Sequence, residues 1–566
     1  MTMDMFDDDV VLLPGGHSPS PQQRAIFAEI ARGRENLLVR ARAGTAKTST
    51  AVAALAYVPR GEKVAFFSFS RSTVAELASR VPPGIDVRTL HGHGNRALRW
   101  KLGTEFEVDE DKTLKLAREA FGDEQRGHPI RGYYYGVQRL IRVAKDTLAP
   151  ATREALDELV DRFAIDAPPD EVLHPARCRY CREMVETNGR GRACPAPTAG
   201  GGAHEFPRLV ECVLHPDGSV DETRTPRAVY LGAAVRLLEL SEVRTELVDY
   251  ADMCWLPVRL GHVPKRYQRV FVDEAQDLSP CQIALLKMSL LRGARICIIG
   301  DDRQALYSFR GADEQTVENL KREFRARELP LSVTYRCARS IVALARKEVP
   351  DYEAAPGSPE GDVLHVTPDR LVEEVAPGDF VISRSNAPLL GLCLRLLRER
   401  KPAVIKGADV LGDLRRFLQK FEITDAGELG RAVDQWFLKE IARLEDKYPE
   451  NSRDLERVVD VVRDKYEAAK AVLDGGSTLD AALARFESVF VRDDAVENGR
   501  VDPRHVIVLG TTHKLKGLEA DRVWMLENTY RREKNLEEKN CWYVAATRAR
   551  HTLFLTRPLK DKEPEA

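Results

Sequence analysis

The chain has 566 residues, 43% of them hydrophobic and 31% charged, so it can fold into several soluble domains. Its net charge of −2 excludes a uniformly basic coat, although a local basic groove for nucleic acid remains compatible with it. No apolar run approaches the ~18 residues of a membrane span, and ten cysteines are too sparse for a disulfide scaffold. We therefore expect a cytoplasmic protein with no membrane partner.

Short apolar runs alternate with helical stretches along the chain. This pattern predicts an α/β fold with parallel sheets flanked by helices. The expected strands include residues 64–67, 270–272, 296–299, 380–382, 506–509 and 553–555. We expect a first domain from residues 1–94 and 266–325 and a second from 326–410 and 502–566, with largely helical insertions at 95–265 and 411–501.

The first motif is a phosphate-binding loop, which follows an apolar run at residues 37–39. In such a loop the backbone N–H groups cradle the phosphates, Lys47 reaches the β- and γ-oxygens, and Thr48 ligates Mg²⁺. Ala46 stands where glycine is usual, which its small side chain makes tolerable if φ is negative. The ATP-binding residues expected here are Ala43, Gly44, Thr45, Ala46, Lys47 and Thr48.

The second motif is an acid pair at the end of the apolar run 270–272. A buried strand that ends here would place Asp273 beside the Mg²⁺ held by Thr48, and Glu274 where it can polarise the attacking water. A single Asp-Glu pair often only caps a strand end. The upstream phosphate-binding loop favours the catalytic interpretation.

Further short motifs follow in a fixed order. They are residues 20–26 (SPQQRAI), 68–71 (SFSR), 89–93 (TLHGH), 300–311 (GDDRQALYSFRG), 335–336 (YR), 511–519 (TTHKLKGLE) and 537–550 (EEKNCWYVAATRAR). Together with the loop and the acid pair, this set resembles the superfamily 1 DNA helicases of the UvrD/Rep type. The resemblance implies two RecA-like motor domains, each interrupted by an insertion. It also implies a helicase that moves 3′→5′ on single-stranded DNA and separates duplex strands with ATP and Mg²⁺.

The resemblance also implies roles for individual residues. Gln23 and Tyr335 would contact adenine, and Glu519 would hold the ribose. The catalytic set would be Lys47, Glu274, Gln304, Arg336 and Arg548, with Thr48 and Asp273 as Mg²⁺ ligands. The DNA contacts would be Phe69, Arg71, Thr89, His91, Tyr307, Phe309, Arg310 and His513. Two further departures, besides Ala46, accompany this match: Asp302 stands where the family commonly has proline, and Ala520 where it commonly has an aromatic residue.

The first insertion contains a candidate zinc site. Cys178 and Cys181 have the spacing of a zinc knuckle, and Cys194 and His204 could complete a tetrahedral, structural site. His174, Cys212 and His215 are rival ligands. Upstream, basic and aromatic residues are interleaved between positions 126 and 145, which fits a nucleic-acid surface and a solvated helix with buried tyrosines equally well.

Three functions compete at this point. The first is an ATP-dependent DNA helicase or translocase acting on single-stranded DNA and its junctions with duplex, with roles in DNA repair and DNA replication both open to it. The second is an ATP switch that the zinc segment recruits to an unidentified protein partner. The complete catalytic set argues against the switch. The third is a helicase–nuclease fusion, which the short sequence after Arg548 disfavours.

Overall fold

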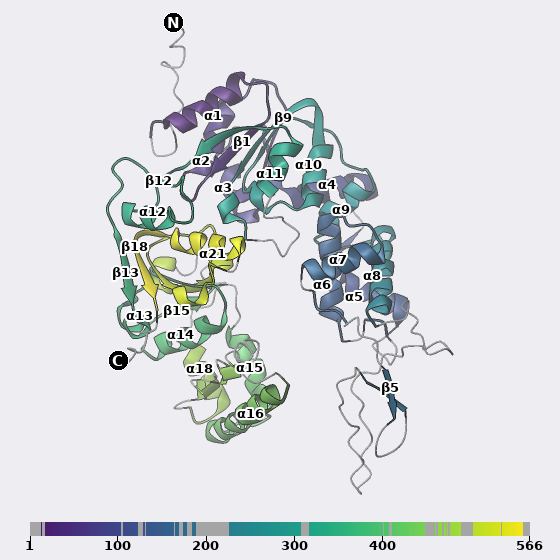
Figure 1. Cartoon of the computed structure of the whole chain (residues 1–566), viewed down its shortest axis with the longest axis vertical. Helices are drawn as coiled ribbons and strands as arrows, with labels where there is room; N and C mark the ends of the chain where they lie inside the picture. Colours follow the sequence, from purple (N-terminus) through teal and green to yellow (C-terminus); the bar gives the residue numbers. More distant parts are fainter. Residues whose placement is uncertain are drawn as a thin grey trace.

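The computed structural model describes residue 13 and most of residues 17–557. Outside the described residues lie 104–105, 123–127, 131, 164, 169–173, 178–183, 188–225, 307–315, 400, 407–409, most of 448–475, 488–501 and 534. Figure 1 shows two α/β domains, each with a helical insertion that extends away from its sheet. The α/β fold class predicted from the sequence is thus confirmed.

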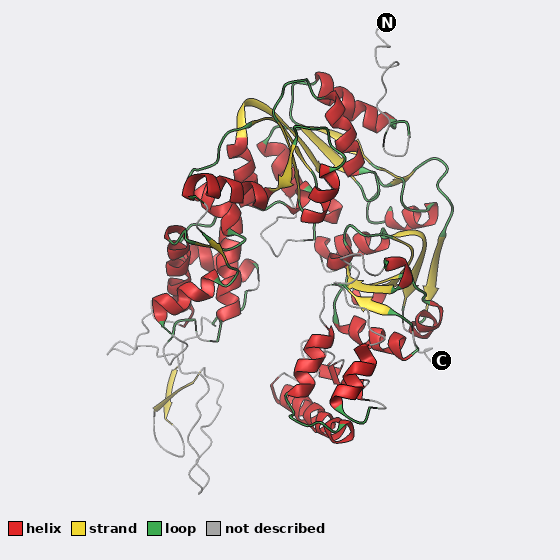
Figure 2. Cartoon of the chain, turned by 180° about the vertical axis from the view of Figure 1, so that it is seen from behind, coloured by secondary structure: helices red, strands yellow, loops and turns green. Residues whose placement is uncertain are grey.

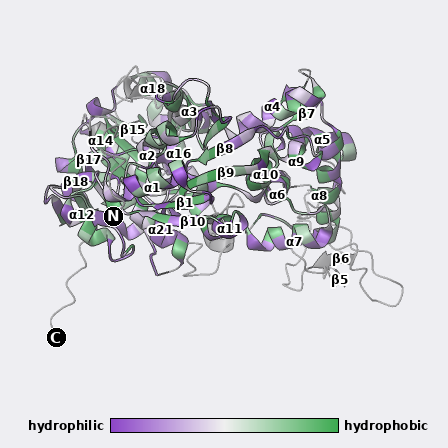
Figure 3. Ribbon diagram, turned by 90° about the horizontal axis from the view of Figure 1, so that it is seen from above, coloured by the Kyte–Doolittle hydropathy of each residue, from purple (hydrophilic) through white to green (hydrophobic). Residues whose placement is uncertain are grey.

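The first domain is built on a six-stranded sheet in which every neighbouring pair is parallel. Its strand order is β10 (Arg327–Leu331), β1 (Leu37–Ala41), β9 (Leu290–Gly300), β8 (Tyr267–Val272), β2 (Val64–Ser68) and β3 (Asp86–Thr89). Figure 3 shows apolar residues in β8 and β9, inside the domain. The C-terminal parts of these strands, residues 270–272 and 296–299, are continuous buried apolar runs, as expected for parallel strands covered on both faces.

The second domain repeats this plan with another parallel six-stranded sheet. Its order is β13 (Asp362–Val366), β18 (Ala549–Thr556), β17 (Ala520–Leu526), β14 (Phe380–Ser383), β16 (Ile507–Thr511) and β15 (Ala403–Ile405). The first sheet continues to Leu331, although the sequence assigned residues from 326 onward to the second domain. β10 pairs with β1 over its whole length, a long-range contact that the local apolar pattern does not reveal.

Helices cover both sheets and build the insertions (Figure 2). Those around the first sheet are α1 (Pro21–Arg32), α2 (Lys47–Ala54), α3 (Arg71–Ala78), α4 (Leu90–Leu102), α10 (Pro280–Ser289) and α11 (Thr316–Glu323). Those around the second are α12 (Arg339–Ala345), α13 (Pro368–Glu374), α14 (Ala387–Arg398), α20 (Thr512–Leu515) and α21 (Leu536–Ala546).

The first insertion has a helical core of its own. Its helices are α5 (Lys112–Phe121), α6 (Tyr134–Thr147), α7 (Arg153–Arg162), α8 (Pro226–Val243) and α9 (Asp252–Arg259). Two fully buried lysines share two aspartates in this core: Lys112 lies 2.6 Å from Asp252, and Lys145 lies 2.6 Å from Asp249 and 2.8 Å from Asp252. Lys145 therefore belongs to a buried ion network and not to a nucleic-acid surface.

The insertion also carries a short antiparallel hairpin, β5 (His174–Arg177) and β6 (Met184–Thr187). The second insertion is formed by α15 (Val410–Gln419), α16 (Ala426–Lys447) and α18 (Leu479–Glu487), which share one apolar core. Among the residues that the structure describes, no helix combines the length and apolar composition needed to cross a bilayer.

The two domains meet at the phosphate-binding loop. Ala43 and Leu306 of the first domain are buried in the same core as residues of α12 and α21. The Tyr335 amide donates to the carbonyl of Gly44, and the Lys516 amine lies 2.5 Å from a carboxylate oxygen of Asp277. The carboxyl ends of the first-sheet strands therefore face the second domain, which is where parallel α/β sheets place their ligands.

Candidate nucleotide site and nucleic-acid surface

The phosphate-binding loop connects β1 to α2. Gly44 has a φ of +69°, and a Cβ on it would lie 2.5 Å from Cβ of Arg336, so no side chain fits there. Thr45 donates from its hydroxyl to the carbonyl of Arg42, 2.9 Å away, which tightens the turn. α2 begins at Lys47, and the side chain of Ala46 makes no cap hydrogen bond to its first N–H groups, which suits a phosphate site.

The expectation that Ala46 would keep a negative φ is wrong. Ala46 has φ +59° and ψ +40°, in the left-handed region. This conformation costs an L-residue about 1–2 kcal/mol relative to the right-handed one. The Ala46 carbonyl accepts hydrogen bonds from both the amide and the hydroxyl of Thr50, each at 2.8 Å, which helps to hold the residue in this geometry.

The acid pair lies against the start of α2. The hydroxyl of Thr48 donates to Oδ2 of Asp273 at 2.6 Å, and the amine of Lys47 lies 3.3 Å from Oε1 of Glu274. Burial, together with the neighbouring Glu274, raises the pKa of Asp273 to about 6. Burial also acts to raise the pKa of Glu274, but Lys47 and Lys516 outweigh it and bring that pKa to about 2. Glu274 is thus ionised at neutral pH, as a base must be.

A chain of hydrogen bonds joins the acid pair to Gln304. Gln276 donates to Glu274 at 2.5 Å, and its side-chain oxygen accepts the amide of Asp301 at 3.0 Å. Asp301 then accepts a 2.7 Å hydrogen bond from the side chain of Gln304. The first domain therefore orients Gln304 at the domain boundary, and the resemblance to the helicases implies that this residue senses the γ-phosphate.

The two arginines predicted to be catalytic lie together in the second domain. Arg336 forms an ion pair with Glu519 and donates to the carbonyl of Thr547 at 3.4 Å. Arg548 is 1% exposed, and its Nη2 has no hydrogen-bond partner in the described part of the chain. Burial and the charge of Arg336 lower the pKa of Arg548 to about 10.

Two crowded guanidiniums, one of them incompletely paired, make this a site that favours an anion. A polyphosphate would supply the missing acceptors for Arg548. Thr48 and Asp273, on the opposite side, offer the oxygen ligands that Mg²⁺ prefers. The residues present therefore fit a magnesium–nucleotide group on both of its sides.

The residues expected to hold adenine and ribose have other partners as well. Gln23 is buried, caps α1 through Ser20 and donates to the hydroxyl of Thr50 at 2.8 Å. The side chain of Tyr335 is open to solvent, with 53% exposed. Glu519 is shared between Arg336 and Arg550, the latter at 3.2 Å. The structure thus brings Tyr335 and Glu519 beside the loop, while Gln23 supports α1 and α2.

Four of the residues expected to contact DNA line one pocket at the edge of the first domain. They are Phe69, Arg71, Thr89 and His91. Arg142, Asp146 and Tyr250 of the first insertion close the same pocket. The hydroxyl of Tyr250 accepts a 2.8 Å hydrogen bond from Arg71. No sequence motif marks Tyr250 or Asp146, because their contact with this edge depends on how the insertion folds back.

Several predicted site residues lie outside the described residues. They are Tyr307, Phe309 and Arg310 of the DNA set and Cys178, Cys181, Cys194 and His204 of the zinc set. The rival ligand His174 lies in β5, and Cys178 follows it in sequence directly after the strand.

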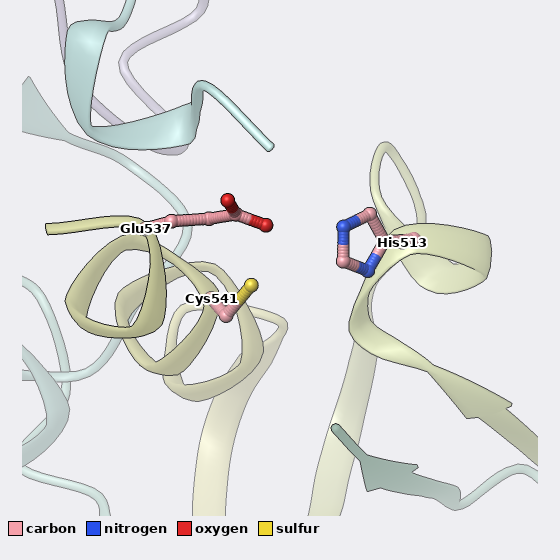
Figure 4. A group of neighbouring side chains, drawn as sticks. All are labelled: His513, Glu537 and Cys541. Carbon is pink, nitrogen blue, oxygen red and sulfur yellow. The ribbon is translucent and has the colours of Figure 1, made fainter. Parts of the chain in front are cut away.

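His513 lies at the domain boundary. Its Nε2 is 3.0 Å from the carbonyl oxygen of Leu306. Figure 4 shows it facing Glu537 and Cys541 of α21, and the three side chains offer ligand atoms within 4.8 Å of one another. Arg384 lies 3.5 Å from Glu537, and burial raises the pKa of the Cys541 thiol to about 12. A guanidinium beside the carboxylate opposes a cation, so we assign the cluster to the domain contact.

Comparisons with known proteins identify two matching families. The model of the UvrD/REP helicase N-terminal domain matches residues 20–325, and that of the UvrD-like helicase C-terminal domain matches residues 384–559. DNA helicase II of Escherichia coli (strain K12) is 23% identical over 347 residues, 56% of this chain and 38% of that protein. DNA helicase II of Haemophilus influenzae is 29% identical over 112 residues, 18% of this chain and 15% of that protein.

The ATP-dependent DNA helicase PcrA of Staphylococcus epidermidis is 27% identical over 115 residues, 19% of this chain and 16% of that protein. The matched segments therefore span 15% to 38% of the length of these three relatives. A solved structure of an arterivirus nonstructural protein 10 (helicase) covers 95% of this chain and 62% of its own at 10% identity. Its TM-score of 0.31 is too low to support an inference.

The left-handed conformation of Ala46 predicts the sign of a stability change. Ala46→Gly should stabilise the protein by about 0.5–1 kcal/mol, because the relief of strain exceeds the added entropy of the unfolded chain. Ala51→Gly, in the interior of the same helix, is the matched control and should destabilise by about 1 kcal/mol. Urea denaturation measures both. A loss of stability in Ala46→Gly comparable to that in the control would contradict the assigned backbone geometry.

Proposed function

Because the chain belongs to the UvrD/REP helicase family, we propose that it is an ATP-dependent DNA helicase. It would move 3′→5′ on single-stranded DNA and separate the strands of a duplex at single-strand–duplex junctions. The observation that carries the proposal is the pairing of Thr48 with Asp273 and of Lys47 with Glu274, opposite the arginine pair Arg336 and Arg548. This arrangement has the parts that phosphoryl transfer requires.

Each residue has a role that follows from its place. Thr48 and Asp273 would hold the Mg²⁺ ion, which supplies Lewis-acid stabilisation of the phosphate oxygens when bound. Glu274, ionised at neutral pH, accepts a proton from the attacking water. Lys47, Arg336 and Arg548 face the charge that develops on the γ-phosphate, and arginines of this kind accelerate hydrolysis roughly 10³–10⁵-fold.

The two arginines lie in one domain and the phosphate-binding loop in the other. ATP bound between them would therefore draw the domains together, and hydrolysis would release them. Gln304 would sense the γ-phosphate in the same motif that carries Tyr307 and Phe309, the proposed base contacts. Repeated closing and opening over stacked bases would move the protein along the strand.

The pocket lined by Phe69 and His91 is the proposed path of single-stranded DNA in the first domain. An aromatic face stacks on any base, at roughly 1–3 kcal/mol for each base, so the grip would be tolerant of sequence. Arg71 and Arg142 add positive charge on the two sides of this pocket. An ATP switch that only binds DNA would need the pocket but not an ionised Glu274.

The first test of this function is substitution of Glu274, the acid proposed to activate water. Glu274→Gln should leave the binding of ATP and DNA nearly intact while removing most turnover, because only proton acceptance is lost. Lys47→Ala should weaken nucleotide binding as well. Glu76→Gln, an exposed acid of α3 that pairs with Arg80, is the control and should hydrolyse ATP like the wild type. Wild-type rates in Glu274→Gln would assign the base to another residue.

The second test concerns DNA. Single-stranded DNA should stimulate ATP hydrolysis, and a duplex with a 3′ single-stranded tail should be unwound in preference to one with a 5′ tail. Phe69→Ala should weaken binding of single-stranded DNA about tenfold through loss of stacking, with a smaller effect on basal hydrolysis. Equal basal and DNA-stimulated rates in the wild type would favour the ATP switch, and unwinding from the 5′ tail would reverse the proposed direction.

A structural zinc ion held by Cys178, Cys181, Cys194 and His204 is a separate part of the proposal. Its support is the antiparallel pairing of β5 with β6, because Cys178 and Cys181 lie in the sequence that connects these strands. We expect about one zinc per chain, and loss of it in Cys178→Ser with ATP hydrolysis retained. Elemental analysis of protein purified under reducing conditions without chelators measures the zinc content. Protein that contains no zinc after this preparation would contradict the proposed site.

A further inference from the structure

Arg42, the first residue after β1 in the phosphate-binding loop, is buried among three carboxylates. Its guanidinium lies 3.1 Å from Asp301 and 2.7 Å from Asp302 in the first domain. It also donates from Nε to both carboxylate oxygens of Asp351, each at 3.0 Å, and its Nη2 lies 2.9 Å from Oδ2 of the same residue. The side chain of Arg42 is 6% exposed, so these acids supply the pairing that a buried charge needs.

Asp302 is an acceptor for two arginines near the end of β1. It stands where the related helicases commonly have proline, and it accepts both Arg42 and Arg40, the latter at 3.2 Å. Proline offers no side-chain acceptor, so neither ion pair would form with that residue. The acidic residue is thus matched to the arginines that extend from the end of β1.

Asp351 connects this cluster to the second domain. The next residue, Tyr352, is fully buried in the second-domain core, and its hydroxyl donates to the carbonyl of Ala43 at 3.0 Å. The amide of Ala43 donates to the hydroxyl of Tyr543, also at 3.0 Å. The second domain therefore holds the front half of the phosphate-binding loop through both side chains and backbone.

The same guanidinium reaches the catalytic groups of the first domain. Asp301 accepts Arg42 on one carboxylate oxygen and Gln304 on the other, at 2.7 Å. The amide of Asp301 donates to the side-chain oxygen of Gln276, whose side-chain nitrogen donates to Glu274. A continuous set of contacts thus runs from Asp351 through Arg42 and Asp301 to Gln304 and to Glu274.

We propose that Arg42 is a positioning residue that couples the docking of the second domain, through Asp351, to the orientation of Gln304 and Glu274. The proposal rests on the ATP-hydrolysing function proposed above. Asp351 is half-exposed, so its pairing is the step that domain opening breaks, whereas Asp301 and Asp302 stay with Arg42. Closing the domains would then restore the bidentate contact and tighten the loop around the phosphates.

Asp351→Asn tests the interdomain contact without removing a buried group. We expect the KM for ATP to rise about 3- to 10-fold, because a weaker interdomain contact lowers the fraction of closed protein that binds ATP. The kcat should change less than about twofold, because saturating ATP restores closure and with it the orientation of Gln304 and Glu274. Asp369→Asn is the matched control: Asp369 is an exposed aspartate of the same domain that pairs with Arg395 of that domain, at 3.2 Å, and both constants should stay at wild-type values.

Arg42→Lys tests the other partner. Lysine keeps the charge beside Asp301 and Asp302 but cannot offer the two parallel donors that Asp351 accepts. It should therefore raise the KM for ATP as Asp351→Asn does, and the double variant should show no further increase. Multiplying effects in the double variant, or an unchanged KM in both single variants, would overturn the proposal.

Small-angle X-ray scattering of the protein without nucleotide gives a readout that does not need activity. Asp351→Asn should shift the radius of gyration to a larger value than in the wild type and in Asp369→Asn, because the domains open more readily. Identical scattering of the three proteins would overturn the coupling. A wild-type protein that fails to hydrolyse ATP would instead refute the proposed function, and the scattering comparison would still decide on the contact.

Discussion

The phosphate-binding loop is the segment on which both domains depend. Its start continues β1 of the first sheet, and its front half is held by Tyr352, Tyr543 and the amide of Tyr335 from the second domain. Gly44 lies so close to Arg336 that no side chain fits between them. Any movement of one domain relative to the other must therefore change the surroundings of this loop, which is how a nucleotide there could control domain geometry.

Electrostatics divide the site into two halves. On the first-domain side, buried acids dominate, and Lys47 with Lys516 keeps Glu274 ionised while burial raises the pKa of Asp273. On the other side, Arg336 and Arg548 repel each other in a buried position. Crowding of like charges in a buried position costs stability, and the nucleotide and Mg²⁺ of the proposed function would relieve it by binding between the two halves.

The proposed nucleic-acid surface likewise consists of two parts. The motifs around Phe69 and His91 supply an aromatic and polar edge, and the first insertion folds back so that Arg142 and Tyr250 face it. Buried pairs such as Lys145 with Asp249 fix the segment next to Tyr250. From its sequence context Lys145 could equally be a solvated surface lysine. In the structure its ammonium group is instead buried in the core of the first insertion.

The sequence by itself determined the α/β class, the most apolar strands of both sheets, and the order of the nucleotide motifs, because apolar runs and phosphate-loop chemistry are local. It also predicted that Thr48 would meet Asp273, since strand ends of parallel sheets share one edge. It did not reveal β3, β10, β13, β15 or β17. Only the tertiary structure decided the left-handed φ of Ala46, the pairing of β10 with β1, and the contact of Arg42 with Asp351. Each of these depends on groups that are distant in sequence and brought together by packing, and no local pattern records such a distance.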